Sequence, residues 1–332
     1  MDKSRQPLSK CSHLLCLPNV VGVGRGHKEV RGRNTGKPVV TVMVTKKIPK
    51  RELPRWAMVP LSLGDAETDV IEVGEIRTLG RTDRERPARP GMSIGHYKIT
   101  AGTFGAVVYD MKTGEPLILS NNHVLANSTN GRDGRAHLGD PILQPGRYDG
   151  GTEKDVIARL ERFVPIYKEV DESRCKIASM AEDVLNYAIK KMKKDYQVKL
   201  YRVSRSPNLV DAAVARPLSA DDIFPDILDI GTPKETADVE IGQLVMKSGR
   251  TSGLTKGRVK VVDATIRIAM GDAGDAIFAE QVVTTQIAAP GDSGSLVVDE
   301  KIRAVGLVSA GSDTVSVFGR IDNVLGQLGV RF

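Results

Sequence analysis

The sequence predicts a mainly β protein, and three features of its composition support this class. The chain of 332 residues contains 33 glycines and 17 prolines, which favour many turns. Runs rich in valine and isoleucine recur between these turns, as is typical of strands. Aromatic residues make up only 4% of the chain, so the core must be largely aliphatic. The length suits one large domain or two smaller ones, and either can bury a core.

The charge of the chain gives little support to a nucleic-acid partner. The formal net charge is +7, and the basic residues are spread along the sequence with local clusters at residues 46–51 and 190–194. Neither cluster is interleaved with aromatic residues, and no nucleic-acid-binding motif accompanies them. We therefore interpret both clusters as solvated faces and expect no nucleic acid among the partners.

The three cysteines, Cys11, Cys16 and Cys175, do not form the pattern of a disulfide framework. Cys11 and Cys16 flank His13, but no second pair of ligands accompanies them, so we expect a buried structural thiol and no metal. The apolar run at residues 14–17 is too short for a signal peptide, and no run approaches a membrane span. These features predict a cytoplasmic protein without a membrane partner.

The first 79 residues predict a small α/β domain. Residues 19–26 have glycines spaced somewhat as in a dinucleotide-binding loop, which must be followed by a helix. Residues 27–37 are polar and glycine-rich instead, so we interpret them as a hairpin loop that leads into a strand at 39–44. A further strand is expected at residues 68–73. The residues of this domain do not indicate its role.

Residues 80–92 are charged and contain prolines, so they predict a linker to a second domain at residues 93–332. In that domain short strand-like runs alternate with turns. One stretch differs, because residues 176–194 carry apolar side chains at helical spacing. It predicts a helical insertion at about residues 170–195, which we expect to pack on the surface of the domain.

A serine in a glycine-rich turn is the first candidate for chemistry. The run Gly291-Asp292-Ser293-Gly294 precedes an apolar strand, and its glycines allow backbone N–H groups to converge on one point. Taken alone, the run is better explained as an ordinary turn. Two residues upstream favour a functional role. His123 follows an apolar strand, and Asp211 lies in an apolar segment where an unpaired carboxylate would be costly.

Serine, histidine and aspartate are the residue types that nucleophilic hydrolysis requires. A serine hydroxyl is too weakly acidic to attack alone, and histidine can accept its proton near neutral pH. A carboxylate can fix the tautomer of the ring and stabilise its charged form. The order His123, Asp211, Ser293 is one of several known for this geometry.

Three segments resemble the catalytic motifs of trypsin-like (chymotrypsin-fold) serine proteases. They are Leu119-Ser120-Asn121-Asn122-His123-Val124-Leu125, Val210-Asp211-Ala212-Ala213 and Gly291-Asp292-Ser293-Gly294. Residues 247–253 and 305–311 are also similar to segments of that family. The resemblance covers about residues 91–332. It is greatest to intracellular bacterial and plant members of the Narrow leaf 1 type, which carry an extra N-terminal domain.

The resemblance implies two six-stranded antiparallel β-barrels with the active site in the cleft between them. It makes His123 the general base, Asp211 the orienting acid and Ser293 the nucleophile. The N–H groups of Gly291 and Ser293 would form the oxyanion hole. The chain would then be a serine endopeptidase that acts through an acyl-enzyme and needs no cofactor.

The substrate-binding residues are likewise implied by the resemblance. Ser309 and Gly311 would pair with the backbone of a peptide substrate. Ile287 falls at the base of the specificity pocket, and Ser316 falls near its wall. Neither is charged, so we expect a small or medium-sized apolar residue before the scissile bond.

The sequence also departs from the family pattern. Ser295 stands where many relatives have a third glycine. In relatives that are activated by cleavage, the aspartate equivalent to Asp292 pairs with a new N-terminus. Residues 93–96 could supply one here, although an internal arginine or backbone groups would serve equally. Lys247 and Arg250 are interpreted as turn residues. The other histidines are interpreted as surface or loop residues: His13, His27, His96 and His137.

Two main classes of function are consistent with the sequence, and an esterase-like hydrolase on the same site is a third, weaker option. The first is an endopeptidase that cleaves protein or peptide substrates. The alternative is a catalytically silent or self-processing protein that uses the protease fold as a binding scaffold, with residues 1–79 providing the partner surface. A homo-oligomer formed through residues 1–79 is a further hypothesis, because a cytoplasmic protease needs restraint.

Overall fold

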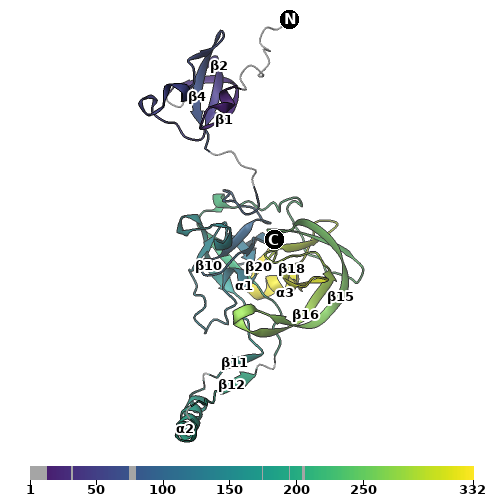
Figure 1. Cartoon of the computed structure of the whole chain (residues 1–332). Coiled ribbons are helices and arrows are strands. Elements are labelled where there is room, and N and C mark those ends of the chain that lie inside the picture. Colours follow the sequence, from purple (N-terminus) through teal and green to yellow (C-terminus); the bar gives the residue numbers. More distant parts are fainter. Residues whose placement is uncertain (1–12, 31–32, 75–79, 174, 194, 204–205) are drawn as a thin grey trace. The chain divides into compact units, whose positions relative to one another are not determined.

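The computed structural model describes residues 13–30, 33–74, 80–173, 175–193, 195–203 and 206–332. Strands dominate the secondary structure, which confirms the mainly β class (Figure 1). The chain divides into two compact units, Met1–Leu79 and Gly80–Phe332.

The first unit is a four-stranded sheet in the order β1-β2-β4-β3. Its elements are β1 (Val20–Val30), β2 (Arg33–Val44), the 3₁₀ turns η2 (Lys50–Glu52) and η3 (Arg55–Ala57), β3 (Ser62–Leu63) and β4 (Ala66–Glu72). β1 and β2 form an antiparallel hairpin, whereas β2 and β4 are parallel. A parallel pair requires a crossover connection, and the segment containing η2 and η3 provides it.

The hairpin corrects one expectation about the first unit. Most of residues 27–37 belong to the strands themselves, because β1 continues to Val30 and β2 resumes at Arg33. The glycines at 22, 24 and 26 therefore lie within β1, where they face the paired strand β2. No helix follows them, which excludes the dinucleotide-binding loop.

The second unit begins with an eight-stranded sheet in the order β20-β7-β8-β13-β10-β9-β5-β6. Its strands are β5 (Ser93–His96), β6 (Gly102–Thr103), β7 (Ala106–Asp110), β8 (Pro116–Ser120), β9 (Pro141–Leu143), β10 (Val156–Phe163), β13 (Ala213–Pro217) and β20 (Val330–Arg331). All neighbouring strands are antiparallel. A six-stranded barrel was expected here. The C-terminal strand β20 enlarges the sheet, because Gly329 ends the preceding helix in a left-handed conformation and redirects the chain.

Six later strands of this unit close into a barrel in the order β14-β15-β16-β19-β18-β17. They are β14 (Leu244–Gly249), β15 (Gly253–Ala269), β16 (Asp275–Thr285), β17 (Leu296–Asp299), β18 (Ala304–Gly311) and β19 (Val315–Arg320). The short helices are α1 (Asn122–Leu125) after β8 and α3 (Ile321–Leu328) after β19.

A continuous apolar core joins the eight-stranded sheet to the barrel. It contains side chains of the sheet, the barrel and α3, among them Val108, Leu117, Leu119, Leu296, Leu307, Ile321 and Val324. All of these are buried. Because the two halves share this core, residues at the ends of their strands keep fixed positions relative to one another.

Residues 80–92 do not form a linker. They belong to the second unit and pack against it, with Ala88 fully buried. Arg81 donates to the hydroxyl of Ser248 at 2.7 Å, and Arg89 pairs with Asp226. The charged side chains that suggested a solvated linker therefore have partners on the body of the unit.

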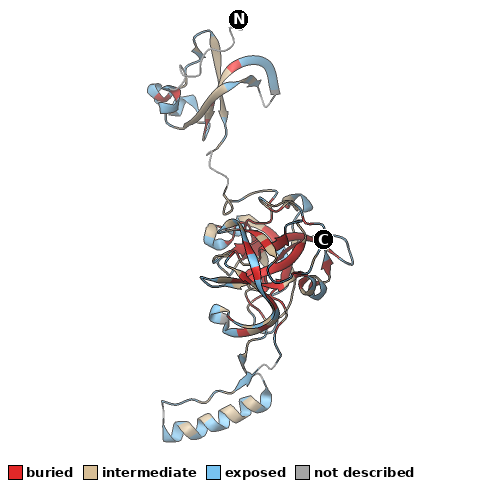
Figure 2. Cartoon of the chain, turned by 90° about the vertical axis from the view of Figure 1, so that its right-hand side faces the viewer, coloured by how far each residue is buried: buried red, intermediate tan, exposed pale blue. Residues whose placement is uncertain are grey.

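The helical insertion is present, but it does not pack as expected. α2 (Lys176–Met192) lies between the paired strands β11 (Val170–Glu172) and β12 (Tyr201–Val203). None of its described side chains is buried (Figure 2), and Ile177 and Met180 are largely exposed. The side chain of Asn186 instead bonds both backbone groups of Val198. The helix is thus held by its own return segment.

Two expectations about single residues are also corrected. His96 is not a surface or loop histidine, because it is fully buried in β5 with Nε2 3.0 Å from Asp140 Oδ2. Cys16 is exposed, as is Cys175, so the expected buried thiol is not found at position 16. Cys11 lies outside the described residues. The described residues include no cluster suited to a metal ion, and none of their helices is long and apolar enough to cross a membrane.

Candidate active site

His123 and Asp211 form a partly exposed pair at the edge of the eight-stranded sheet. His123 lies in α1, directly after β8, and Asp211 lies just before β13, the strand that pairs with β8. The distance between His123 Nδ1 and Asp211 Oδ2 is 2.5 Å, and Asp211 Oδ1 accepts the backbone N–H of His123 at 3.1 Å. With its proton on Nδ1, the neutral ring has an acceptor at Nε2.

The charge of Asp211 affects the protonation of His123. Burial lowers the pKa of the imidazole, but the attraction and the hydrogen bond of Asp211 outweigh it, and the net effect is to raise the pKa of His123 above 6.5. The side chain of Asp211 is only 1% exposed, whereas that of His123 is 24% exposed. The histidine can therefore meet a ligand while its carboxylate partner is shielded from water.

Two asparagines that sequence reasoning did not assign hold this pair in place. Asn121 donates its side-chain amide to the backbone oxygen of Asp211 at 2.7 Å, which ties the two segments together. Asn122 donates to the backbone oxygens of Thr129 and Val164. Both asparagines are fully buried. Their position directly before the histidine in the sequence was the signal that could have identified them. Buried amides need defined hydrogen-bond partners, which ties such residues to one arrangement.

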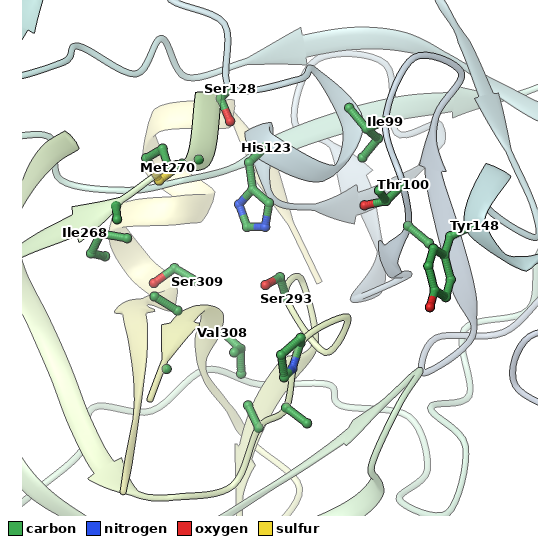
Figure 3. A pocket seen from close by; sticks show the side chains of 18 of the residues that line it. Ile99, Thr100, His123, Ser128, Tyr148, Ile268, Met270, Ser293, Val308 and Ser309 are labelled. Atoms are coloured by element: carbon green, nitrogen blue, oxygen red, sulfur yellow. The ribbon is translucent and has the colours of Figure 1, made fainter. Parts of the chain in front are cut away.

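Ser293 lies across a cleft from His123, in the turn before β17. Both residues line one cavity of about 960 Å³. In Figure 3 the ring of His123 and the hydroxyl of Ser293 face the same open space. The structure contains no hydrogen bond between these two described side chains. Such bonds commonly become short only when a substrate is bound.

The turn before Ser293 presents two backbone donors. The N–H groups of Gly291 and Ser293 have no acceptor among the described residues. Thr251 Oγ1 donates to the carbonyl of Pro290 at 2.8 Å. Because a peptide bond is planar and trans, fixing this carbonyl turns the N–H of Gly291 to the opposite side. The turn is thus held in a conformation that leaves both N–H groups available to an oxyanion.

The position of Gly291 requires glycine. Its φ is +98°, a conformation that other residues rarely adopt. A Cβ there would also lie 2.5 Å from Thr251 Oγ1. On the other side of the residue, Thr103 Oγ1 donates to the carbonyl of Gly291 at 2.9 Å. Two threonines from different segments therefore fix the peptide planes on both sides of Gly291.

Asp292 has an internal partner, which is a lysine. The distance between Lys247 Nζ and Asp292 Oδ2 is 2.9 Å, and both side chains are 0% exposed. Asp292 also accepts hydrogen bonds from the backbone N–H groups of Ala289 and Thr251 and from the hydroxyl of Ser252. A new N-terminus is therefore not needed to compensate this carboxylate. Residues 93–96, the expected source of one, form the buried strand β5.

Burial and ion pairing affect the two groups of this pair differently. Burial alone would raise the pKa of Asp292, but Ser252, Lys247 and the N–H of Ala289 together hold it below 3.8. Burial lowers the pKa of Lys247, and Asp292 opposes this only in part. Lys247 is thus not a turn residue as expected, but a buried residue of β14 that braces the serine turn.

Ser295 and Arg250 complete the support of the turn. The hydroxyl of Ser295 donates to the carbonyl of Asp292 at 2.6 Å, a bond that the glycine of the family pattern could not make. Arg250 binds both carboxylate oxygens of Asp149, which lies in the part of the unit that contains the eight-stranded sheet. Arg250 does lie in the turn after β14, as expected, and its side chain connects that turn to the opposite half.

The expected substrate-binding residues fall into two groups. Ser309 and Gly311 line the cavity at the end of β18. Ile287 and Ser316 are buried and are not among the residues that line it. The hydroxyl of Ser316 accepts the backbone N–H of Ile287 at 3.0 Å, so these two residues support the wall from behind. The apolar surface beside Ser293 comes instead from Ala288, Ala289, Pro290, Val308 and Ala310.

Comparison with known proteins finds similarity to solved structures. No protein-family model matches the chain, and no match was found among the curated proteins. Similar solved structures include Thermobifida fusca protease A, with 16% identity over 74% of this chain and 98% of that chain and a TM-score of 0.46. Nocardiopsis protease has 16% identity over 74% of this chain and 98% of that chain, with a TM-score of 0.45. Cellulomonas bogoriensis chymotrypsin has 15% identity over 73% of this chain and 96% of that chain, also with a TM-score of 0.45. Values this low carry no conclusion about catalysis, which must rest on contacts within this chain.

Proposed function

We propose that this protein is a serine endopeptidase in which Ser293 attacks a peptide carbonyl and forms an acyl-enzyme. The observation that carries the proposal is the pair of His123 and Asp211. The carboxylate holds Nδ1 of the ring, and the ring faces the cleft that Ser293 lines. His123 Nε2 then accepts the proton of the attacking hydroxyl and returns it to the leaving amine.

The serine turn supports the second requirement of this reaction, which is stabilisation of negative charge. When the hydroxyl adds to the carbonyl, the carbonyl oxygen becomes an oxyanion. The free N–H groups of Gly291 and Ser293 would donate to it. Because Thr251 and Thr103 already fix the neighbouring peptide planes, the donors need little reorganisation during the reaction.

The open edge of β18 favours a polypeptide substrate. β17 ends its pairing with β18 at Leu296 and Leu307, while β19 continues to pair along the other edge to Gly311. On the first edge Val308 still bonds the backbone of Gly294 and Ser295, and none of the described strands pairs with that edge further on. An extended peptide can therefore add as an antiparallel strand at Ser309 and Gly311 and continue past Ser293 in both directions.

One observation favours the silent alternative. Ser293 Oγ makes no hydrogen bond to His123, although both side chains are described. If Ser293 and His123 stayed unbonded when a peptide entered the cleft, the protein would bind the peptide without cleaving it. Residues 1–79 could provide a further partner surface, but nothing in the described part of that unit supports the homo-oligomer expected from the sequence.

Labelling with a fluorophosphonate probe distinguishes these two functions. The probe reacts covalently with a serine that a neighbouring base activates. We expect wild-type protein to be labelled, with the modification mapped by mass spectrometry to Ser293, and Ser293→Ala to remain unlabelled. Ser219→Ala, which changes an exposed serine, should be labelled like the wild type. Folded wild-type protein that resists the probe would contradict the peptidase and support the silent binding protein.

A further inference from the structure

The two walls of the cleft carry opposite charges. In Figure 3 the labelled residues Ile99, Thr100 and Tyr148 lie on one side of Ser293, and Ile268, Met270 and Ser309 lie on the other. The charged residues that line the same cavity are neighbours of these in the chain. Lys98 and Arg147 adjoin Ile99 and Tyr148, whereas Asp272 and Asp313 follow Met270 and Gly311.

These four charges are available to a ligand. Each of the four side chains belongs to an exposed residue, and none forms an ion pair within the described part of the chain. Arg147 Nε donates to the carbonyl of Tyr97 at 2.9 Å, and Lys98 Nζ lies 5.2 Å from the ring centroid of Tyr97. The two basic side chains are thus gathered around one residue. Arg250 and Asp149, which lie close by, neutralise each other instead.

The proposed reaction gives the cleft a direction. The acyl half of a substrate, before the scissile bond, would lie along β18 and the tip of the β15–β16 hairpin, where Asp272 and Asp313 are found. The leaving half would pass His123 and continue towards Lys98 and Arg147. Opposite charges attract over these distances, although salt screens exposed groups strongly.

We propose that the cleft selects polypeptides by charge, with basic residues before the scissile bond and acidic residues after it. This inference rests on the proposed function, because the direction follows from the proposed pairing of the acyl half with β18 and from the role of His123 beside the leaving amine. It concerns residues about two or more positions from the bond, since the surface beside Ser293 itself is apolar. Lys98, Arg147, Asp272 and Asp313 are the residues that determine this specificity.

Binding to the Ser293→Ala variant tests the selection without cleavage. The probes are two fluorescent peptides, one with the order Arg-Lys-Ala-Ala-Asp-Glu and one with the order Glu-Asp-Ala-Ala-Lys-Arg. They have the same composition and net charge, so general attraction to a basic protein is equal for both. An exposed ion pair changes affinity by about two- to fivefold, so with charges on both walls we expect the first peptide to bind about tenfold more tightly in dilute salt. The difference should shrink in concentrated salt.

Reversal of the wall charges provides the matched control. One variant combines Ser293→Ala with all four reversals: Lys98→Glu, Arg147→Glu, Asp272→Lys and Asp313→Lys. In this variant the second peptide should bind more tightly than the first. Equal affinity of the two peptides, or no binding of either, would overturn the charge selection. Fluorophosphonate labelling of the wild type reports on the proposed peptidase separately. A labelled enzyme with no peptide preference would contradict only the charge selection, and an unlabelled protein with the expected preference would contradict only the peptidase.

Discussion

The eight-stranded sheet and the barrel each contribute a buried carboxylate with a basic partner, but the two pairs differ in their access to solvent. Asp211 beside the sheet pairs with His123, whose side chain is 24% exposed. Asp292 in the serine turn pairs with Lys247, and both side chains are 0% exposed. The first pair therefore reaches the cleft, and the second is enclosed.

This difference indicates different tasks for the same kind of pair. Histidine changes its charge near neutral pH, so a half-open His–Asp pair can accept a proton during a reaction. A lysine enclosed with a carboxylate has no proton acceptor from solvent, and the pair can only hold the backbone around it. Asp292 accordingly binds three segments: β14 through Lys247, the following turn through Thr251 and the serine turn through Ala289. The pair of His123 and Asp211 is suited to proton transfer, and the pair of Lys247 and Asp292 is suited to holding the backbone of the serine turn.

The largest expected effect comes from neutralising the exposed pair. In the wild-type protein, the proposed peptidase activity should fall as the pH drops through the pKa of His123, because imidazolium cannot accept a proton. The midpoint should lie above 6.5. Asp211→Asn removes the groups that raise this pKa and leaves burial, which lowers it. We expect kcat to fall by about 10⁴-fold because the tautomer is no longer held. The remaining activity should have a midpoint shifted to lower pH, as measured by pH–rate profiles.

A second His–Asp pair offers the control for this variant. His96 lies in β5 and Asp140 directly precedes β9 of the same sheet, but neither lines the cleft. Asp140→Asn should therefore leave the midpoint of the pH–rate profile unchanged, whatever it does to stability. If Asp211→Asn moved the midpoint no more than Asp140→Asn, His123 would not be the base.

The next largest effect concerns the enclosed pair and is expected in stability. Lys247→Met leaves the carboxylate of Asp292 buried without its cation. Breaking a buried pair in this way costs about 3–5 kcal/mol of unfolding free energy, which denaturant titration measures. Lys256→Met, on the neighbouring strand β15, changes an exposed lysine and should stay within about 0.5 kcal/mol of wild type. Equal stability of the two variants would show that Lys247 is not structural. Adding Asp292→Asn to Lys247→Met should restore part of the loss.

The sequence pointed to the groups that we propose to react more readily than to the groups that hold them. His123, Asp211 and Ser293 each stand in a motif whose residue types follow from the chemistry, so they could be proposed before any contact was known. The α2 helix was likewise found from its apolar periodicity. Burial of a lysine is different, because it depends on a carboxylate 45 residues away in the chain. Lys247 was therefore interpreted as a turn residue, although its strand β14 was recognisable.

The errors have the same origin. Residues 80–92 looked like a linker because they are charged, but Arg81 and Arg89 pair with Asp229 and Asp226 far along the chain. α2 looked like a packed insertion because it has an apolar face, but no neighbouring element of the described chain covers that face. Sequence patterns report what a residue prefers. Which partner satisfies the preference is decided by the fold.

The smallest of these effects tests whether the enclosed pair reaches catalysis through the serine turn. Thr251 bonds Asp292 through its backbone N–H and the carbonyl of Pro290 through its hydroxyl. Thr251→Val removes the hydroxyl, and with it both the bond to Pro290 and the bond that the hydroxyl accepts from Arg250 Nη1 at 2.9 Å. The peptide before Gly291 can then rotate and withdraw one oxyanion donor part of the time. Complete loss of one such donor lowers kcat by about 10²–10³-fold. Because the donor is withdrawn only part of the time here, we expect kcat to fall by about tenfold with little change in KM.

Thr251→Ser keeps the hydroxyl and should retain wild-type kcat, whereas all three proteins should unfold at similar denaturant concentrations. This result would separate positioning from stability, since a merely structural threonine would change unfolding and kcat together. If Thr251→Val and Thr251→Ser had the same kcat, the carbonyl of Pro290 would be fixed without Thr251. The pair of Lys247 and Asp292 would then hold the serine turn only through backbone hydrogen bonds. Its coupling to the site of His123 and Asp211 would be weaker than the hydrogen bonds indicate.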